Sequence, residues 1–278
     1  MKKSLKIFLA LFFILVICSN VIAESTIIDT REEDKILSNP VKNALLKSMK
    51  DVKATDIITF GHYEQDNDLL NGKEDVEWIV LTNNYENREA ILISKHILDC
   101  LRFNGFHVYA TWETSSLRAY MNTTMLNDMF TENEIKCLKK TTLINSPNLF
   151  NGTFSGNNTE DYLFIPGIDE MYVFFSNDYF YNDAKVTELL RPNELRIAYA
   201  TKYAVARGVR VLEKGAKFKG AGNYFLRTTG LLGHRIWFDE TYGDFFQSYV
   251  SELGEIKPDG TGINSSDDGI RVMVILNY

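Results

Sequence analysis

The sequence predicts an α+β fold with antiparallel sheets, two adjacent helices and long loops. Three observations support this. Aromatic residues make up 13% of the chain, and many short β-branched and aromatic runs favour strands. Helix-capping signals gather near the middle of the chain, between strand-like runs on either side. No repeat and no long linker interrupts residues 55–278, so we expect one domain there.

The first 23 residues are typical of a secretory signal peptide. Three lysines precede an apolar run at residues 7–18. This run of about 12 residues is shorter than the roughly 20 needed to span a bilayer. Ala23 is a small residue immediately before Glu24, as leader peptidase requires. We therefore expect cleavage after Ala23, a secreted or extracytoplasmic protein, and no transmembrane segment in the mature chain.

The cysteines leave two questions open. Leu15-Val16-Ile17-Cys18 resembles a lipobox, so a lipoprotein anchored at Cys18 is the alternative, although Ile17 is bulkier than that signal normally allows. After cleavage, Cys100 and Cys137 remain in a chain bound for an oxidising compartment. They either form a disulfide or stay buried as small hydrophobic residues.

Residues 24–54 form a polar N-terminal segment with one helix signal. Asn39 is a suitable N-cap and Pro40 suits the first helical position. Val41, Leu45 and Met49 follow at four-residue spacing and give one narrow apolar stripe. We expect either a helix packed on the main domain or a stalk.

Strands and helices then follow in order. Strand patterns occupy residues 58–63, 76–82 and 89–95, separated by turn-rich segments, and predict an antiparallel meander. Thr114 or Ser115 is expected to cap a helix reaching residue 130, with Leu117, Met121, Met125 and Met129 on one face. Thr131 and Glu134 form a capping box for a second helix.

The second half continues with a loop at residues 145–160, a short strand at 162–167 and a helix at 168–175. Another helix is expected from Thr201 to Gly208, whose glycine suits a C-cap. Strand patterns return at residues 223–230, 247–256 and 269–278. In the last of these, Ile270, Val272, Val274 and Leu276 alternate, and we expect it to pair with the early strands in a central sheet.

Catalytic and metal-binding motifs are missing from the sequence. It contains no GxSxG, HExxH or GxGxxG pattern, and residues 215–220 have Walker-A glycine spacing without the following Lys-Ser/Thr. Asp66, Asp68 and Glu77 match three positions of a calcium loop, but Leu70 and Asn71 replace the fifth ligand and the turn glycine. We therefore predict no cofactor and no metal.

Charge excludes two further classes of partner. The net charge of the chain is −7, and removing residues 1–23, which hold three lysines and no acidic residue, makes it −10. An acidic protein is poorly suited to nucleic acid or to anionic lipid. We expect neither as a partner.

Six strings in order, from ITFGHYEQD and VEWIVL through AILISKHILDC and TWETSSLRAYMN to NYFLRTTG and GIRVMVIL, resemble domain-of-unknown-function family 6273 of exported bacterial proteins. The resemblance runs from about residue 55 to 278. It implies a C-type-lectin-like fold, as in formylglycine-generating enzymes. That activity requires a late cysteine pair, and no cysteine follows Cys137, so formylglycine-generating activity is excluded.

The sequence departs from the family pattern at two places. The family's W-W-L-R-S-P-G strand is here Tyr224 to Gly230, which keeps the aromatic pair, Arg227 and the glycine but loses the Ser and Pro. Ser115 stands where many members have a cysteine. A family disulfide from that position to Cys100 therefore cannot form.

Most of the polar residues in these strings have a structural interpretation. We expect Trp112 to be packed and Arg118 to pair with a buried carboxylate. Arg227 either pairs in the same way or grips a ligand carboxylate or sugar.

The late aromatic segment is the predicted binding surface. Residues 230–246 show neither a two-residue nor a 3.6-residue period, so we interpret them as a loop whose aromatic residues cannot all face one core. The candidate ligand-binding residues are Tyr224, Arg227, His234, Arg235, Trp237, Asp239 and Tyr242.

Three functions remain open at this stage. The first is a secreted or cell-surface non-catalytic binding module for an unknown surface glycan or protein. The second is a structural protein of the cell envelope. The third is a hydrolytic enzyme that uses His234 with Asp239, Glu240 and Asp244.

Overall fold

The computed structural model describes residues 39–175, 187–213, 215–237 and 240–278, and between residues 233 and 244 it describes the backbone path only. The predicted signal peptide, Cys18 and the Ala23 cleavage site lie outside the described residues. In the described part, no helix is both long and apolar enough to cross a bilayer.

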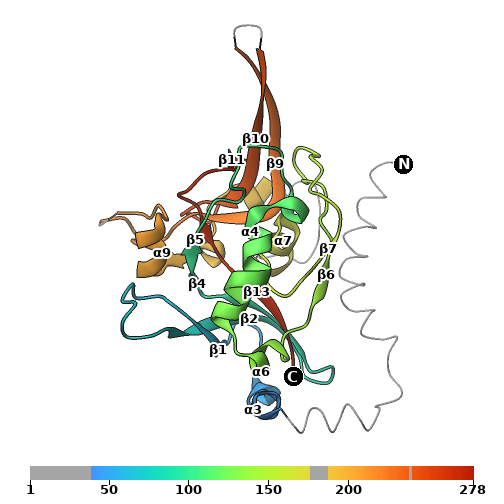
Figure 1. The fold of residues 1–278 in the computed structure, drawn as a ribbon, viewed down its shortest axis with the longest axis vertical. Helices are drawn as coiled ribbons and strands as arrows, with labels where there is room; N and C mark the ends of the chain where they lie inside the picture. The colour runs from blue at the N-terminus through green and yellow to red at the C-terminus, as the bar shows by residue number, and fades with distance from the viewer. Residues whose placement is uncertain (1–38, 176–186, 214, 238–239) are drawn as a thin grey trace.

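The fold is α+β, with two antiparallel-rich sheets and short helices (Figure 1). One sheet has four strands in the order β1-β2-β3-β13. The other has five in the order β11-β10-β9-β12-β5. Two small two-stranded ladders, β4-β8 and β6-β7, complete the sheets of the described residues.

The strands have the following bounds: β1 Ile57–Tyr63, β2 Glu74–Asn84, β3 Glu89–Ser94, β4 His96–Ile97, β5 Asp99–Cys100, β6 Thr141–Leu143, β7 Thr159–Asp161, β8 Tyr199–Ala200, β9 Tyr224–Trp237, β10 Glu240–Val250, β11 Ile256–Gly262, β12 Gly269–Ile270 and β13 Met273–Asn277. The helices are α3 Pro40–Ser48, α4 Ser116–Tyr120, α5 Leu126–Met129, α6 Glu132–Ile135, α7 Ile168–Phe175 and α9 Lys202–Arg207. Single turns lie at η1 Met49–Asp51, η2 Trp112–Thr114, η3 Met121–Met125, η4 Thr187–Leu190 and η5 Glu194–Arg196.

The N-terminal helix forms where its capping signal predicts. The Asn39 side chain accepts hydrogen bonds from the backbone amides of Val41 and Lys42, and Pro40 begins α3. Leu45 and Met49 are buried in the core. The helix is therefore packed on the domain, as one of the two alternatives predicted.

The predicted central helix is present but interrupted. Ser115 caps α4, and the chain then makes a π turn at η3 before α5. Met121, Met125 and Met129 are all buried, as their spacing predicts. Thr131 and Glu134 form the predicted capping box at α6.

The C-terminal segment joins the two sheets. Its first part, β12, pairs with β5 and β9, and its second part, β13, pairs antiparallel with β3. Residues 269–276 are buried on both faces. The prediction that this segment pairs with the early strands in a central sheet is confirmed.

Arg271 fills the step between β12 and β13. Its Nε donates to the Ser94 carbonyl at 3.0 Å and its Nη1 to the Tyr224 hydroxyl at 3.3 Å. Its guanidinium also lies 5.6 Å from the ring centroid of Phe175. A buried cation is therefore held by hydrogen bonds and aromatic faces between the two sheets.

Two strand predictions were wrong in position. The strand expected at 162–167 lies earlier, at β7. The backbone amides of Tyr162 and Leu163 donate to Asn122 Oδ1, so they form no hydrogen bonds to a neighbouring strand. The strand expected at 247–256 is broken after Val250. There Gly254 has φ +75°, and a Cβ on it would lie 2.1 Å from the Asn193 carbonyl oxygen, so the chain must turn.

The expected loop at residues 230–246 is a β-hairpin. Strands β9 and β10 pair as far as Trp237 and Glu240, and the hairpin extends beyond the rest of the described chain (Figure 1). Two strands that pair mainly with each other need no single buried face, so their sequence shows no two-residue period. The missing period led to the wrong prediction of a loop at residues 230–246.

Cys100 and Cys137, the two cysteines among the described residues, are free. Cys100 lies on β5, where its thiol contacts the carbonyls of Ser266 and Asp268, whereas the Cys137 thiol contacts Asn133. Burial raises the pKa of the Cys100 thiol to about 12. The Cys100–Cys137 disulfide, one of two alternatives from sequence, does not form because each thiol is enclosed in a different part of the core.

Candidate functional site

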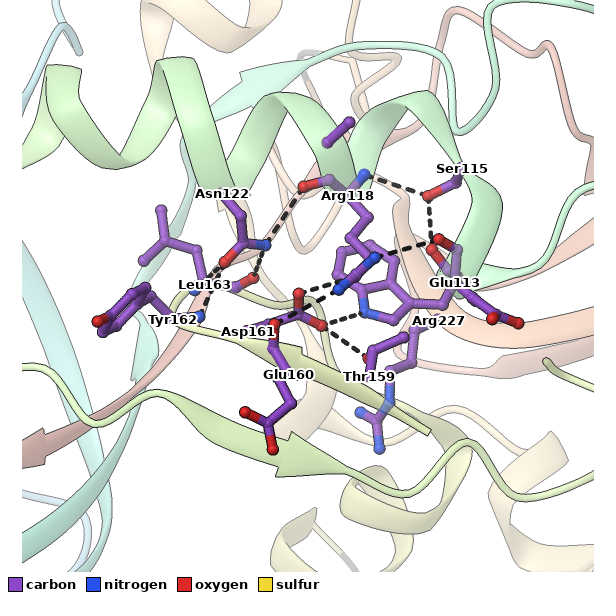
Figure 2. Close-up of polar contacts among 12 residues, drawn as sticks. Glu113, Ser115, Arg118, Asn122, Thr159, Glu160, Asp161, Tyr162, Leu163 and Arg227 are labelled. Carbon is purple, nitrogen blue, oxygen red and sulfur yellow. Dashed lines mark hydrogen bonds and ion pairs between the residues drawn. The ribbon is translucent and has the colours of Figure 1, made fainter. Parts of the chain in front are cut away.

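Arg118 and Trp112 both contact Asp161 in a buried polar network, and Figure 2 shows Arg118 and Asp161 within it. Both donate to the Asp161 carboxylate, Arg118 Nε at 2.7 Å and Trp112 Nε1 at 3.0 Å. Thr159 donates to the same carboxylate at 2.7 Å. Asp161 is only 1% exposed, so the structural interpretation of this Trp and Arg is confirmed.

Asn122 extends this network along the helix. Its Nδ2 donates to the Leu163 carbonyl at 2.8 Å and its Oδ1 accepts the Tyr162 amide at 2.8 Å. Figure 2 shows both contacts joining the helical segment to the chain after β7. The network therefore fixes the position of a helix against a short ladder.

Arg227 is buried rather than surface-exposed. Its Nη2 lies 2.5 Å from the Glu170 carboxylate, and its Nε donates to the Asn145 side chain at 3.2 Å. Gly167 lies so close that a Cβ there would be 2.7 Å from a Glu170 oxygen. A buried, fully partnered Arg of this kind has no free fork for a ligand.

Tyr224 is also in the interior. Its hydroxyl donates to the Arg196 carbonyl at 2.7 Å, and its ring faces the Arg271 guanidinium. Tyr224 is fully buried and Arg227 is 2% exposed. The first residues of strand β9 lie in the core, so neither Tyr224 nor Arg227 can contact a ligand at the surface. The prediction that these two residues bind a ligand was wrong.

The other predicted ligand-binding residues lie in the outer half of the hairpin. In the backbone register, His234 pairs with Gly243, Arg235 with Tyr242, and Trp237 with Glu240. Asp239 lies outside the described residues. The strands therefore bring four of the predicted residues, His234, Arg235, Trp237 and Tyr242, to one projecting element.

Exposed apolar side chains gather around the base of this hairpin. We call them the hairpin-base patch. Its members share high exposure for their type and come from the segment after β5, the loop before β7, and β9: Phe106 77%, Val108 53%, Tyr109 41%, Phe154 54%, Leu231 41% and Leu232 42%.

Direct contacts connect these three segments. The Tyr109 ring centroid lies 5.9 Å from that of Phe245, and the Tyr109 hydroxyl donates to the Phe154 carbonyl at 3.2 Å. Phe245 pairs in register with Leu232 across the hairpin. The His107 ring also contacts Phe245, at 5.8 Å. These contacts connect the loop before β7, the segment after β5 and, through Phe245, the Leu232 position of β9.

The base beneath the patch is firmly held. The Asn148 side-chain amide donates to the carbonyls of Thr229 and Pro258, at 2.8 and 2.9 Å. Ser155 accepts the Thr229 amide at 3.1 Å. At Gly230 a Cβ would lie 2.5 Å from the Asp259 carbonyl oxygen, so only glycine allows this close packing.

Sequence reasoning missed the patch residues outside the hairpin. Gly105-Phe106-His107-Val108-Tyr109 is an apolar run beside a glycine, outside any helix or strand pattern. Such a run in a loop is the signal that could have identified Phe106 and Val108. Phe154, inside a Gly/Asn/Ser loop, gives the same signal more weakly.

Comparisons with known proteins give one match. The sequence model of the family described as Domain of unknown function (DUF6273) matches residues 87–278. No curated protein and no solved structure matches the chain. The C-type-lectin-like assignment therefore stays a prediction, and β1 and β2 precede the matched residues. Because the match covers most of the chain, this protein belongs to the DUF6273 family.

Proposed function

We propose that this protein is an exported, non-catalytic binding module that engages a protein partner through the hairpin-base patch. Export is supported by the signal-peptide pattern of residues 1–23. The patch itself is the single observation that carries the binding proposal. Six exposed apolar side chains from three segments form it, and contiguous apolar surface of this kind marks interaction sites on soluble proteins.

The chemistry of the patch favours a protein over a sugar. Val108, Leu231 and Leu232 are aliphatic, and they offer neither a flat aromatic face nor a hydrogen-bonding group to a sugar ring. Phe106 and Phe154 add aromatic area without polar atoms. Apolar and aromatic side chains at the centre of a patch are typical of protein interfaces.

The rigidity of the base supports the same proposal. The hydrogen bonds from Asn148 and Ser155 fix the loop before β7 against β9. A surface that is already ordered loses little conformational entropy on binding. The projecting outer hairpin would extend the contact with Arg235, Trp237 and Tyr242, whose places in the register follow from β9–β10 pairing.

The experiment is a parallel screen of a surface-protein array and a glycan array, both probed with the mature chain from Glu24. We expect reproducible protein spots and no glycan spots. Glycan spots without protein spots would show that the ligand is a carbohydrate and would contradict the proposal of a protein partner. If the probe binds only immobilised copies of itself, the envelope-structural alternative gains support.

A further inference from the structure

Three carboxyl groups converge at one end of the first hairpin. Glu64 follows β1, Glu74 begins β2, and Asp66 lies in the connection between them. One oxygen from each lies within 4.8 Å of the other two. Such a cluster is repulsive unless a proton or a cation is shared among its members.

Glu74 and Asp66 both accept hydrogen bonds. Glu74 Oε2 accepts the backbone amide of Gln65 at 2.6 Å. Asp66 accepts the Asn71 side-chain amide at 2.9 Å and the Asp68 backbone amide at 2.8 Å. Both oxygens of the Asp66 carboxylate are therefore hydrogen-bonded.

Glu64 is the exception. Its side chain is 6% exposed, and its Oε1 is a buried oxygen without any hydrogen-bond partner. A buried carboxylate oxygen with no donor carries a desolvation cost. The Lys202 charge acts on Asp66, the outer member of the cluster.

We propose that Glu64, Asp66 and Glu74 bind a calcium ion. Carboxylate oxygens are hard ligands, which favour Ca²⁺ or Mg²⁺ over softer metals. Calcium accepts six to eight oxygens in a flexible geometry, whereas magnesium keeps several of its waters in a strict octahedron. Three carboxyl groups with oxygens within 4.8 Å of one another, one of them on a buried side chain, therefore suit calcium better than hydrated magnesium. The positive charge of the ion compensates the buried Glu64 carboxylate, which has no hydrogen-bond donor on Oε1. The ion also connects the end of β1 to the start of β2.

This ligand set differs from the calcium-loop pattern rejected in the sequence. Only Asp66 is common to both, and Glu77 instead pairs with Lys95 at 2.8 Å. Glu64 and Glu74 were missed because they stand outside the loop spacing. Strand pairing brings them together, since Tyr63 and Glu74 are partners in the β1–β2 register.

Calorimetric titration of the chelator-treated mature chain with CaCl₂ tests the site. The titration extends to about 10 mM, beyond the weakest affinities of extracellular calcium modules. We expect one site per chain and a higher melting temperature with calcium. Glu64→Gln and Asp66→Asn should each weaken calcium binding about tenfold or more. Asp75→Asn is the matched control, since Asp75 neighbours Glu74 in sequence but pairs with His62, and it should bind like wild type.

Thermal melting in EDTA shows whether each variant folds without calcium. If Glu64→Gln does not fold, Asp66→Asn, at a more exposed position, tests the site in its place. Absence of calcium heat together with an unchanged melting temperature would overturn the proposal. Wild-type affinity in both ligand variants would overturn it equally. Equal affinity for MgCl₂ would overturn the assignment to calcium.

Discussion

The Tyr109 ring lies 5.9 Å from the Phe245 ring and connects the segment after β5 to the β9–β10 hairpin. Tyr109 is 41% exposed, so its ring contacts the hairpin and is also accessible to solvent. The same contact therefore builds the hairpin base and contributes to the apolar patch.

This contact predicts a measurable coupling. A double-mutant cycle with Tyr109→Ala and Phe245→Ala should give a coupling free energy of about 0.5–1.5 kcal/mol, as expected for aromatic pairs. Urea unfolding of the four proteins measures it. Strict additivity of the two changes would show that the rings do not support each other in solution.

Deleting residues 269–278 should abolish cooperative unfolding. These residues supply β12 and β13, and β13 pairs with β3 along its whole length. Deleting these residues exposes a new edge in each of the two sheets. It also removes side chains that are buried on both faces of the segment. Differential scanning calorimetry checks the result. A truncated chain with a cooperative transition near the full-length temperature would contradict the observed topology.

Arg227→Ala should destabilise the fold by about 3–5 kcal/mol, because it leaves Glu170 charged and buried without its partner. The double variant Arg227→Met/Glu170→Leu removes both charges and should recover much of that loss. Chemical denaturation measures both. A cost below about 1 kcal/mol for the single variant would mean that Arg227 is not held in the core.

Stability should depend on pH through Asp268. Burial, the largest cause, raises the pKa of this 2% exposed carboxyl to about 6 from an ordinary 3.8. The native state therefore favours the protonated form. Its stabilising contribution is complete below about pH 4 and is lost as pH rises through 6.

Asp268→Asn should consequently raise the unfolding free energy at pH 7, by up to about 3 kcal/mol, and change it little at pH 4. Asp267→Asn, at the exposed neighbouring position, removes only a charge that adds to the raised pKa of Asp268, and it should show a much smaller difference. Denaturation at both pH values measures it. A variant that is equally destabilised at pH 4 and pH 7 would show a structural effect in place of a titration.

Local signals predicted the helices and most strands. Asn39, Ser115, Thr131 and Thr201 all cap helices, because a capping hydrogen bond depends on residues within three positions. Buried strands such as β3 were found from continuous apolar runs. Local sequence is sufficient for features that are set locally.

Long-range contacts decided what was missed. Asn122 removes two amides from a strand-like segment 40 positions away. Arg227 has a partner in α7, which no spacing rule could supply. The hairpin-base patch combines segments more than 100 residues apart in sequence, so its continuity appears only in three dimensions.

The measurement that tests the account most directly compares binding by two triple variants. Phe106→Ser/Leu231→Ser/Leu232→Ser removes half of the side chains of the hairpin-base patch, one from the segment after β5 and two from β9. Leu69→Ser/Leu70→Ser/Leu195→Ser removes exposed leucines elsewhere, with exposures of 74%, 97% and 55%. Both should keep a cooperative transition, with that of the patch variant somewhat lower because Leu231 and Leu232 are only 41% and 42% exposed.

Biolayer interferometry against each protein that the array identifies then gives the affinities. We predict that the patch variant binds at least about 30-fold more weakly than wild type, a loss of about 2 kcal/mol typical of an interface centre. The control variant should bind as wild type does. A folded patch variant with wild-type affinity for every such protein would contradict the claim that the hairpin base is the binding surface.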